Sequence, residues 1–305
     1  MHRVRGILLV VAGLCLVLAG CGKSPGATSA AGKSPETLNI SAIPDQDPQV
    51  LQRQYDALTG YLSRTLGVKV RYVPVTDYTA TITGFRTGDL DLVFFGGLTG
   101  VQARLQVPGA VPLVQRDIDA QFRSVFIATA RAGVQPFTDV SGLAAVAGRT
   151  LTFGSESSTS GRLMPQHFLE QVGVGLNRLK GQPGFSGSHD ATIKLVESGA
   201  FDVGAVNAAV WDDRTKNGKV DQTKVREVFR TPPFHDYHWL IRPDVDKRLG
   251  SGFTQRATQA FLDIDGGDDQ EKQLLTLFQC KGFTATEAAN YQQIESVGRS
   301  VGLIK

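Results

Sequence analysis

Four consecutive hydroxyl residues followed by a glycine are the part of this chain best suited to hold an anion. They form the run Ser157-Ser158-Thr159-Ser160-Gly161, between a strand-like stretch at residues 149–154 and a helix-like stretch at residues 163–172. The first N–H groups of a helix have no intrahelical acceptor, and the helix dipole adds partial positive charge there. Neutral hydroxyl donors can then hold an oxyanion without a lysine or arginine. One hydroxyl would indicate only a helix cap, whereas four in a row predict an anion site.

The elements around this run alternate between strands and helices. The apolar pattern predicts strands at residues 38–43, 68–73 and 90–95, and helices at residues 48–66 and 77–87. Gly67 and Gly88 end the two helices, as glycine commonly does. Alternation of this kind predicts an α/β fold with a mostly parallel sheet, in which ligands bind beyond the carboxyl ends of the strands.

A weak internal repeat places two more polar side chains at helix starts. Tyr78 lies ten residues before Gly88, and His189 lies ten residues before Gly199; a strand-like run follows each glycine. The repeat predicts two lobes of related design, with Tyr78 and His189 entering one cleft from opposite sides. Chance similarity between two common helix–turn–strand units is the alternative.

The N-terminus has the pattern of a bacterial lipoprotein signal. Two arginines precede an apolar stretch at residues 7–18 that is too short to span a bilayer, and Leu18-Ala19-Gly20-Cys21 matches a lipobox. We expect residues 1–20 to be removed, Cys21 to carry the lipid, and residues 21–36, which are small and polar, to form a flexible tether. An ordinary signal peptide cleaved after small residues is the alternative.

Composition fits a soluble globular protein. Hydrophobic residues make up 41% of the chain and charged residues 20%, and the formal net charge of only +3 gives no reason to expect nucleic acid as a partner. Cys15 leaves with the signal peptide and Cys21 carries lipid, so Cys280 has no disulfide partner within the mature chain. We expect Cys280 to be a packed or idle thiol, and we expect no cofactor.

Several motifs resemble those of one family of transport proteins. They are Asp77-Tyr78, Ser158-Thr159-Ser160-Gly161, Ser188-His189-Asp190 and the run Gly-Asp-Leu-Asp-Leu-Val-Phe-Phe-Gly at residues 88–96. Together they resemble the phosphonate-, phosphite- and phosphate-binding lipoproteins of ABC transporters, and the resemblance covers nearly the whole mature chain. A subgroup named for selenate transport is similar at residues 43–46, 95–104, 154–165 and 185–192.

The resemblance implies a two-lobe periplasmic-binding-protein fold of type II, which closes on its ligand. Two strands would cross between the lobes, near residues 123–130 and 237–242. One lobe would comprise residues 37–125 and 240–305, and the other residues 130–236.

The resemblance also implies the ligand-binding residues. In the family, the residues that match Tyr78, His189 and the hydroxyl run donate hydrogen bonds to an oxyanion, and each is identical here. With Ser157 added from the same run, the expected ligand contacts are Tyr78, Ser157, Ser158, Thr159, Ser160 and His189. Further candidates are Phe95, Gly96, Phe122 and Asn207.

The implied function is the lipid-anchored solute-binding component of an ABC importer, not an enzyme. It would capture a small oxyanion of the phosphonate, phosphite or selenate class and deliver it to a permease with its ATPase. We expect a monomer, anchored through Cys21 at the outer face of the cytoplasmic membrane and facing the periplasm if the host has an outer membrane.

Two departures from the family pattern narrow the range of ligands that we expect. Some relatives have a tyrosine where this chain has Phe122, so one phenol donor is missing or Arg123 replaces it. Aminophosphonate binders have an acidic residue in the stretch that matches residues 207–211, whereas the nearest acid here is Asp212. The absence of that acid argues for a bare oxyanion without an amine.

Acidic residues near the predicted site need an explanation, because a carboxylate repels an anion. Glu156 must point away or accept a hydrogen bond from a protonated oxyanion such as hydrogen phosphite; selenate and sulfate have no proton to give. Asp45, Asp77 and Asp190 raise the same question, and we expect Asp77 and Asp190 to cap helices. We expect Arg162 to be solvated or paired.

The residues also offer three alternative functions: metal binding, hydrolysis and signalling. His235 and His238 suggest a metal, but their spacing suits a helix and no third ligand accompanies them, so we predict no metal site. A secreted serine hydrolase would need Ser160 to meet His189 across the cleft, yet neither an orienting acid nor a G-x-S-x-G elbow is evident. An extracellular sensor that signals to a membrane kinase would use the same fold as a transport protein.

Overall fold

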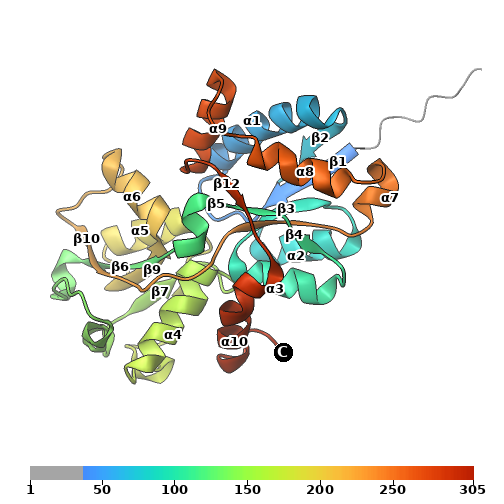
Figure 1. Ribbon diagram of the computed structural model, residues 1–305. Helices are drawn as coiled ribbons and strands as arrows, with labels where there is room; N and C mark the ends of the chain where they lie inside the picture. The colour runs from blue at the N-terminus through green and yellow to red at the C-terminus, as the bar shows by residue number, and fades with distance from the viewer. Residues whose placement is uncertain (1–36) are drawn as a thin grey trace, which may run out of the picture. The chain divides into compact units, whose positions relative to one another are not determined.

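The computed structural model describes residues 37–305; the predicted signal peptide, Cys21 and the tether lie outside the described residues. Two five-stranded sheets divide this part of the chain into two lobes, each with helices packed on its sheet (Figure 1). This arrangement confirms the predicted α/β fold class. Between residues 37 and 305, every helix is too short or too polar to cross a membrane.

The first lobe has the strand order β2-β1-β3-β11-β4. β1 pairs in parallel with β2 and β3, whereas β11 runs antiparallel to β3 and β4. The strands of this lobe, including the separate β5–β12 ladder, are β1 (Thr37–Ala42), β2 (Lys69–Tyr72), β3 (Leu92–Phe95), β4 (Val111–Pro112), β5 (Val114–Arg116), β11 (His238–Ile241) and β12 (Phe283–Ala285). Its helices are α1 (Pro48–Leu66), α2 (Tyr78–Thr87), α3 (Gly97–Gln106), α7 (Val245–Leu249), α8 (Phe253–Leu262), α9 (Asp269–Phe278) and α10 (Gln292–Ser300).

The second lobe has the strand order β10-β6-β9-β7-β8. β7 pairs in parallel with β8 and β9, whereas β6 runs antiparallel to β9 and β10. The strands are β6 (Ser124–Thr129), β7 (Leu151–Phe153), β8 (Gly184–Phe185), β9 (Val203–Asn207) and β10 (Val225–Arg230). The helices are the π-helical turn η4 (Thr159–Leu163), α4 (Met164–Gln171), α5 (His189–Glu197) and α6 (Ala208–Lys216). Short 3₁₀ helices in the two lobes are η1 (Asp117–Gln121), η2 (Ala130–Ala132), η3 (Val140–Val146), η5 (Leu176–Arg178) and η6 (Ala288–Tyr291).

The two lobes are built to a related plan. Read from β8 to β10, the second sheet places β9 third, which is the position of β3 in the first sheet. α2 begins at Tyr78 and leads to β3, just as α5 begins at His189 and leads to β9. Gly88 and Gly199 follow these helices with φ of +89° and +78°, a conformation that glycine adopts at little cost. The internal repeat in the sequence therefore corresponds to two equivalent structural units, as predicted.

The chain passes between the lobes twice, once from β5 to β6 and once from β10 to β11 (Figure 1). The two passages are joined at Phe122 and Phe234, whose backbones exchange two hydrogen bonds of 2.9 Å. β6 lies in the second sheet and β11 in the first, so each passage is the short segment before these strands. The residue boundaries of the lobes remain a prediction.

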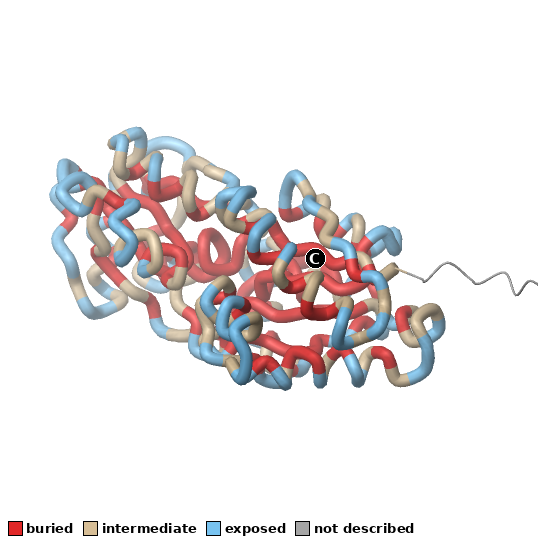
Figure 2. The backbone as a smooth tube through the Cα atoms, turned by 90° about the horizontal axis from the view of Figure 1, so that it is seen from above, coloured by how far each residue is buried: buried red, intermediate tan, exposed pale blue. Residues whose placement is uncertain are grey.

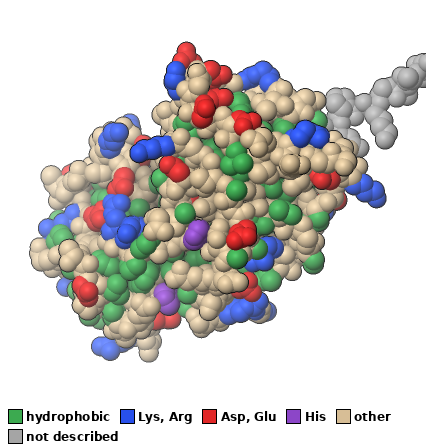
Figure 3. All heavy atoms as spheres, viewed as in Figure 1, with side chains coloured by type: hydrophobic (Ala, Val, Ile, Leu, Met, Phe, Trp, Pro, Cys, Tyr) green, Lys and Arg blue, Asp and Glu red, His purple; other side chains and the backbone are tan. Residues whose placement is uncertain are grey.

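Both sheets are buried by the helices around them. All residues of β3, β9 and β11 are buried, and Figure 2 shows buried strands inside and exposed residues on the outer helices. Strands covered on both faces are apolar throughout, which explains the continuous apolar runs in the sequence. On the face seen in Figure 3, acidic and basic side chains are interspersed.

Candidate functional site

Two helix starts position the predicted phenol and imidazole. Asp77 caps α2 by accepting the N–H of Ala80 at 2.7 Å, so Tyr78 becomes the first residue of that helix. Ser188 caps α5 in the same way and makes His189 its first residue. Tyr78 is only 2% exposed and His189 is fully buried. The two side chains therefore occupy equivalent places in the two lobes.

The hydroxyl run forms a widened helical turn rather than an ordinary helix start. The Oγ of Ser158 caps this turn by accepting the N–H of Gly161 at 3.0 Å. Pro165 has no N–H to offer, and the carbonyl of Gly161 instead accepts the N–H of Gly154 at 2.9 Å. The helix predicted at residues 163–172 is thus preceded by a π-helical turn, a form that occurs frequently at functional sites.

Thr159 connects the second lobe to the first. Its Oγ1 accepts the backbone N–H of Leu98, at the start of α3, at 2.9 Å. A Cβ atom placed on Gly96 would lie only 3.2 Å from the same oxygen, so the lobes approach closely here. Because a hydroxyl is both donor and acceptor, Thr159 still has a proton to donate.

His189 is held as a neutral imidazole with its proton on Nε2. Burial lowers the pKa of His189 to about 4. Its Nδ1 lies 3.3 Å from the backbone nitrogen of Asn207, so Nδ1 accepts that N–H and carries no proton itself. The Nε2–H lies 3.4 Å from the hydroxyl of Tyr237. His189 therefore presents a neutral N–H donor, which suits an oxyanion.

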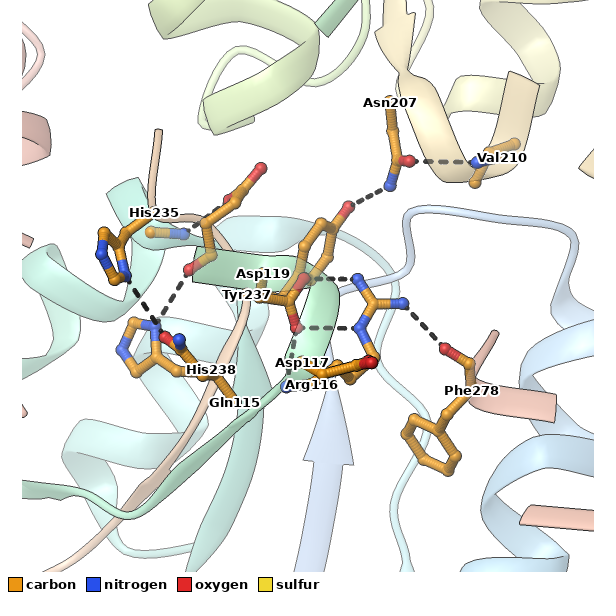
Figure 4. Close-up of polar contacts among 12 residues, drawn as sticks. Gln115, Arg116, Asp117, Asp119, Asn207, Val210, His235, Tyr237, His238 and Phe278 are labelled. Atoms are coloured by element: carbon orange, nitrogen blue, oxygen red, sulfur yellow. Dashed lines mark hydrogen bonds and ion pairs between the residues drawn. The ribbon is translucent and has the colours of Figure 1, made fainter. Parts of the chain in front are cut away.

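Tyr237 joins three parts of the fold through one hydroxyl. The hydroxyl donates to Oδ2 of Asp45 at 2.7 Å and accepts from Nδ2 of Asn207 at 2.9 Å; Figure 4 shows the second contact. Asp45 comes from the first lobe, Asn207 from the second, and Tyr237 from the passage between β10 and β11. Burial raises the pKa of Asp45 to about 6, although the hydrogen bond from Tyr237 counters part of this rise.

Asp236, on the same passage, is a buried carboxyl with an unused oxygen. Its Oδ1 accepts the N–H of Gly97 at 2.9 Å, but its Oδ2 has no hydrogen-bond partner among residues 37–305. Burial raises the pKa of Asp236 to about 7. The hydroxyls of Tyr78 and Ser160 are also buried and lack partners within the described residues. A buried polar group without a partner is costly, so these three atoms are candidates for contact with a ligand.

Arg116 supports the aromatic residues beneath this site. Its guanidinium lies 5.0 Å from the ring centre of Tyr237, and 5.4 and 5.8 Å from those of Phe94 and Phe122. Asp119 binds it through contacts of 2.6 and 2.8 Å, and the carbonyl of Phe278 accepts a further N–H (Figure 4). Since Asp119 already balances its charge, Arg116 positions Tyr237 rather than acting as a free cation for an anion.

Comparison with known proteins decides the family. The family described as "ABC transporter, phosphonate, periplasmic substrate-binding protein" matches residues 40–291. The chain belongs to this family. Family members bind solutes for import, which confirms the prediction that the chain is not an enzyme.

Two curated relatives and one solved structure show how far the similarity extends. The chain is 45% identical over 273 residues to the "Probable ABC transporter phosphite binding protein PhnD1" of Prochlorococcus marinus, covering 89% of this chain and 92% of that protein. It is 26% identical to the "Phosphate-import protein PhnD" of Mycolicibacterium smegmatis, covering 97% and 95%. The structure of P. marinus PhnD1 in complex with methylphosphonate matches with a TM-score of 0.87 and 45% identity, over 88% of this chain and 100% of that chain. This match confirms the type II periplasmic-binding-protein fold.

The remaining residues predicted to contact the ligand have different positions in the structure. Ser157 is half-buried at the edge of the π-helical turn. Gly96 precedes α3 as its cap residue, and Phe122 packs edge to face against Tyr237 with ring centres 5.4 Å apart. Phe95 packs edge to face against Phe85 of α2 in the core. Direct contact of these residues with a ligand remains a prediction.

Three of the acidic residues near the predicted site take different roles in the structure. Asp77 caps α2, as predicted. Glu156 is exposed, as a side chain that points away from the site would be. The capping prediction for Asp190 is wrong, because Ser188 caps α5 and Asp190 pairs with Arg214 at 2.7 Å.

Arg162 departs from the prediction that it would be solvated or paired. It is only 8% exposed, and no ion pair is found for it among the described residues. Its guanidinium instead lies over the rings of Phe153 and Phe185, at 4.7 and 5.2 Å from their centres. Burial lowers the pKa of Arg162, and aromatic faces are favourable partners for a planar guanidinium in such a setting.

The hydrolase and metal hypotheses find no assembled site in residues 37–305. Ser160 and His189 both belong to the second lobe, and no carboxylate in this range accepts a hydrogen bond from the imidazole of His189. No group of three or more metal-binding side chains occurs in the same range. His238 packs against Tyr291, with ring centres 4.0 Å apart. Cys280 is half-buried, and burial raises its pKa to about 12, as suits an idle thiol.

Sequence reasoning missed Asp236 and Tyr237 as site residues. It considered the run His235-Asp236-Tyr237-His238 only as a possible metal site. A usable signal was present, because this run overlaps the start of the predicted crossing strand at residues 237–242, and a crossing segment must border the cleft between the lobes. An acid and a phenol at such a place are candidates for ligand contact.

Proposed function

We propose that this protein captures phosphite, or a small phosphonate, as a singly protonated oxyanion between its two lobes. The observation that carries the proposal is the set of buried atoms without partners within residues 37–305: the hydroxyls of Tyr78 and Ser160, and Oδ2 of Asp236. The hydroxyls suit the charged oxygens of the ligand, and the carboxyl suits an oxygen that shares a proton. Selenate and sulfate are fully ionised at neutral pH and have no proton to share with this carboxyl, which would repel them once it is ionised.

The names of the relatives support a small phosphorus oxyanion, since one is described as phosphite-binding and its structure holds methylphosphonate.

We further propose that Cys21 anchors the protein by lipid, and that the ligand-bound form delivers its cargo to an ABC permease with its ATPase. The lipobox in the sequence supports the anchor, and membership of the family supports the importer. Incorporation of a labelled fatty acid that is lost on Cys21→Ser tests the anchor. Uptake of labelled phosphite that is lost on deletion of the permease tests delivery.

Thermal unfolding with a panel of anions tests the ligand. The chain from Gly22 onward is heated with phosphite, methylphosphonate, aminoethylphosphonate, phosphate, selenate, selenite or sulfate. A ligand at a hundred times its dissociation constant adds about 2.7 kcal/mol to the free energy of unfolding. Stabilisation by phosphite or methylphosphonate is expected. Stabilisation by selenate or sulfate alone would overturn the proposal and favour the selenate subgroup.

A further inference from the structure

A polar cluster beside the candidate site joins the lobes through the loop between β1 and α1. The backbone N–H of Asp47 donates to Oδ2 of Asp190 at 2.9 Å. The carbonyl of Asp45 accepts the N–H of His189 at 2.9 Å. Residues 45–47 of the first lobe are therefore docked on the first turn of α5 in the second lobe.

Arg214 prepares Asp190 for this contact. Its Nε and Nη2 bind the two carboxylate oxygens of Asp190 at 2.7 and 3.1 Å, and the two side chains are only 13% and 16% exposed. The same Nη2 lies 3.4 Å from Oε1 of Gln46 in the first lobe. Because a planar guanidinium holds both oxygens at once, Asp190 is already oriented to accept the N–H of Asp47 when the lobes meet.

We propose that Asp190 and Arg214 form a latch that sets the affinity for the ligand without touching it. The latch stabilises the closed arrangement, which is the state that holds the ligand. Without the latch a smaller fraction of the protein would be closed, and the apparent affinity would fall in proportion to that fraction. The docked loop also carries Asp45, whose carboxyl reaches Tyr237 at the site, so the latch helps to position it. This inference rests on the proposed function, because it assumes that the ligand binds between the lobes.

The test compares Asp190→Asn with the matched control Asp212→Asn in the full-length chain. Asp212 lies on α6 with Arg214 and pairs with Arg230 at 2.6 Å, but this partner lies on β10 and so belongs to the second lobe as well. The first readout is amide hydrogen exchange at Leu98 in the ligand-free protein, because that N–H bonds across the lobes to Thr159, far along the chain from the substitution. The second readout is the association and dissociation rate of phosphite, with methylphosphonate as the alternative probe.

For Asp190→Asn we expect faster exchange at Leu98 and about tenfold weaker binding of phosphite, mostly through faster dissociation, with a lower melting temperature because Arg214 loses its bidentate partner. Asp212→Asn should leave both readouts as in the wild type. Arg214→Lys keeps the positive charge but cannot bind both carboxylate oxygens of Asp190 as the planar guanidinium does, so it should give a smaller change of the same kind.

Wild-type exchange at Leu98 in Asp190→Asn, or an equal effect of Asp212→Asn, would overturn the latch. If Asp190→Asn does not fold, Arg214→Lys decides by the same two readouts. If the wild-type protein binds neither probe, the proposed function fails, while exchange at Leu98 still decides whether the latch holds the lobes together.

Discussion

Thr159 of the second lobe accepts the backbone N–H of Leu98 of the first lobe at 2.9 Å. The first N–H groups of α3 have no acceptor within their own helix, and Thr159 of the opposite lobe supplies an acceptor for one of them. Thr159 was expected to be a ligand donor, and its hydroxyl is also a contact that holds the lobes together. Because the proposed ligand site lies between the lobes, a substitution that only separates the lobes should weaken binding.

Gly96→Ala should act in this way. The added Cβ would lie 3.2 Å from Oγ1 of Thr159 and 3.3 Å from Oδ1 of Asp236, both closer than ordinary contacts. We expect affinity for phosphite to fall about tenfold, measured by isothermal titration calorimetry, with little change in melting temperature. Gly60→Ala on α1 is the control, because only Arg64 lies near its Cβ, at 3.7 Å, and alanine favours the helix. Wild-type affinity in Gly96→Ala would contradict the close approach of the lobes.

Tyr78→Phe and Ser160→Ala should weaken binding without destabilising the ligand-free protein. Neither hydroxyl makes a hydrogen bond of good geometry within the described residues, so each change removes a buried polar atom that is available to a ligand. A lost hydrogen bond to a charged ligand costs roughly 1.5–3 kcal/mol, or about one to two decades in dissociation constant. Ser157→Ala, at a half-buried position, should have a smaller effect. If both buried variants bind phosphite like the wild type, the site lies elsewhere.

The sequence predicted the local elements well because their signals are local. The helix at residues 48–66 was expected from apolar spacing and a closing glycine, and α1 spans Pro48–Leu66. The hydroxyl run and the helix starts at Tyr78 and His189 were found in the same way. By contrast, Asp45 and Tyr237 are 192 residues apart and meet only because the passage between the lobes packs against the first lobe.

Asp190 shows that a local sequence pattern can also predict a role that the residue does not have. Its position after Ser188, at a helix start, is typical of a cap, and a local pattern cannot indicate more. Its actual partners are Arg214 on α6 and the N–H of Asp47, which is 143 residues away in the sequence. Contacts between lobes depend on how two separately folded sheets are brought together, so they are not encoded in the periodicity of either segment.

Asp236→Asn should reduce discrimination between protonated and fully ionised anions. The amide cannot accept and share a proton with the ligand, and it removes the charge that repels selenate and sulfate. We expect the ratio of selenate to phosphite affinity to rise by about tenfold or more, measured by calorimetry with both anions. Glu156→Gln is the control, since that carboxylate is exposed and the ratio should stay constant. An unchanged ratio in Asp236→Asn would remove Asp236 from the specificity of the site.

Closure of the ligand-free protein should weaken as the pH rises. Burial raises the pKa of Asp45 to about 6 and that of Asp236 to about 7, against a usual value of 3.8 that solvation in an open cleft would restore. Between pH 3.8 and these raised pKa values, each carboxyl is protonated in the closed arrangement and ionised in the open one. The two carboxyls therefore favour closure fully below pH 3.8, and this advantage is lost as the pH rises past 6 for Asp45 and past 7 for Asp236. His189 acts in the opposite direction, because burial lowers its pKa from 6.5 to about 4, so closure gains from this residue as the pH rises from 4 to 6.5. The two carboxyls together outweigh this single group, so closure still weakens as the pH rises.

Fluorescence energy transfer between one exposed label on each lobe would measure this change. We expect the distance between the lobes to increase from about pH 5 to about pH 8 in the wild type. Asp236→Asn has no carboxyl to ionise at that position, so its distance should change little, because Asp45 and His189 act in opposite directions over nearly the same pH range. An interlobe distance that does not vary with pH in the wild type would mean that the two carboxyls stay solvated, and that neither shares its proton with a bound oxyanion.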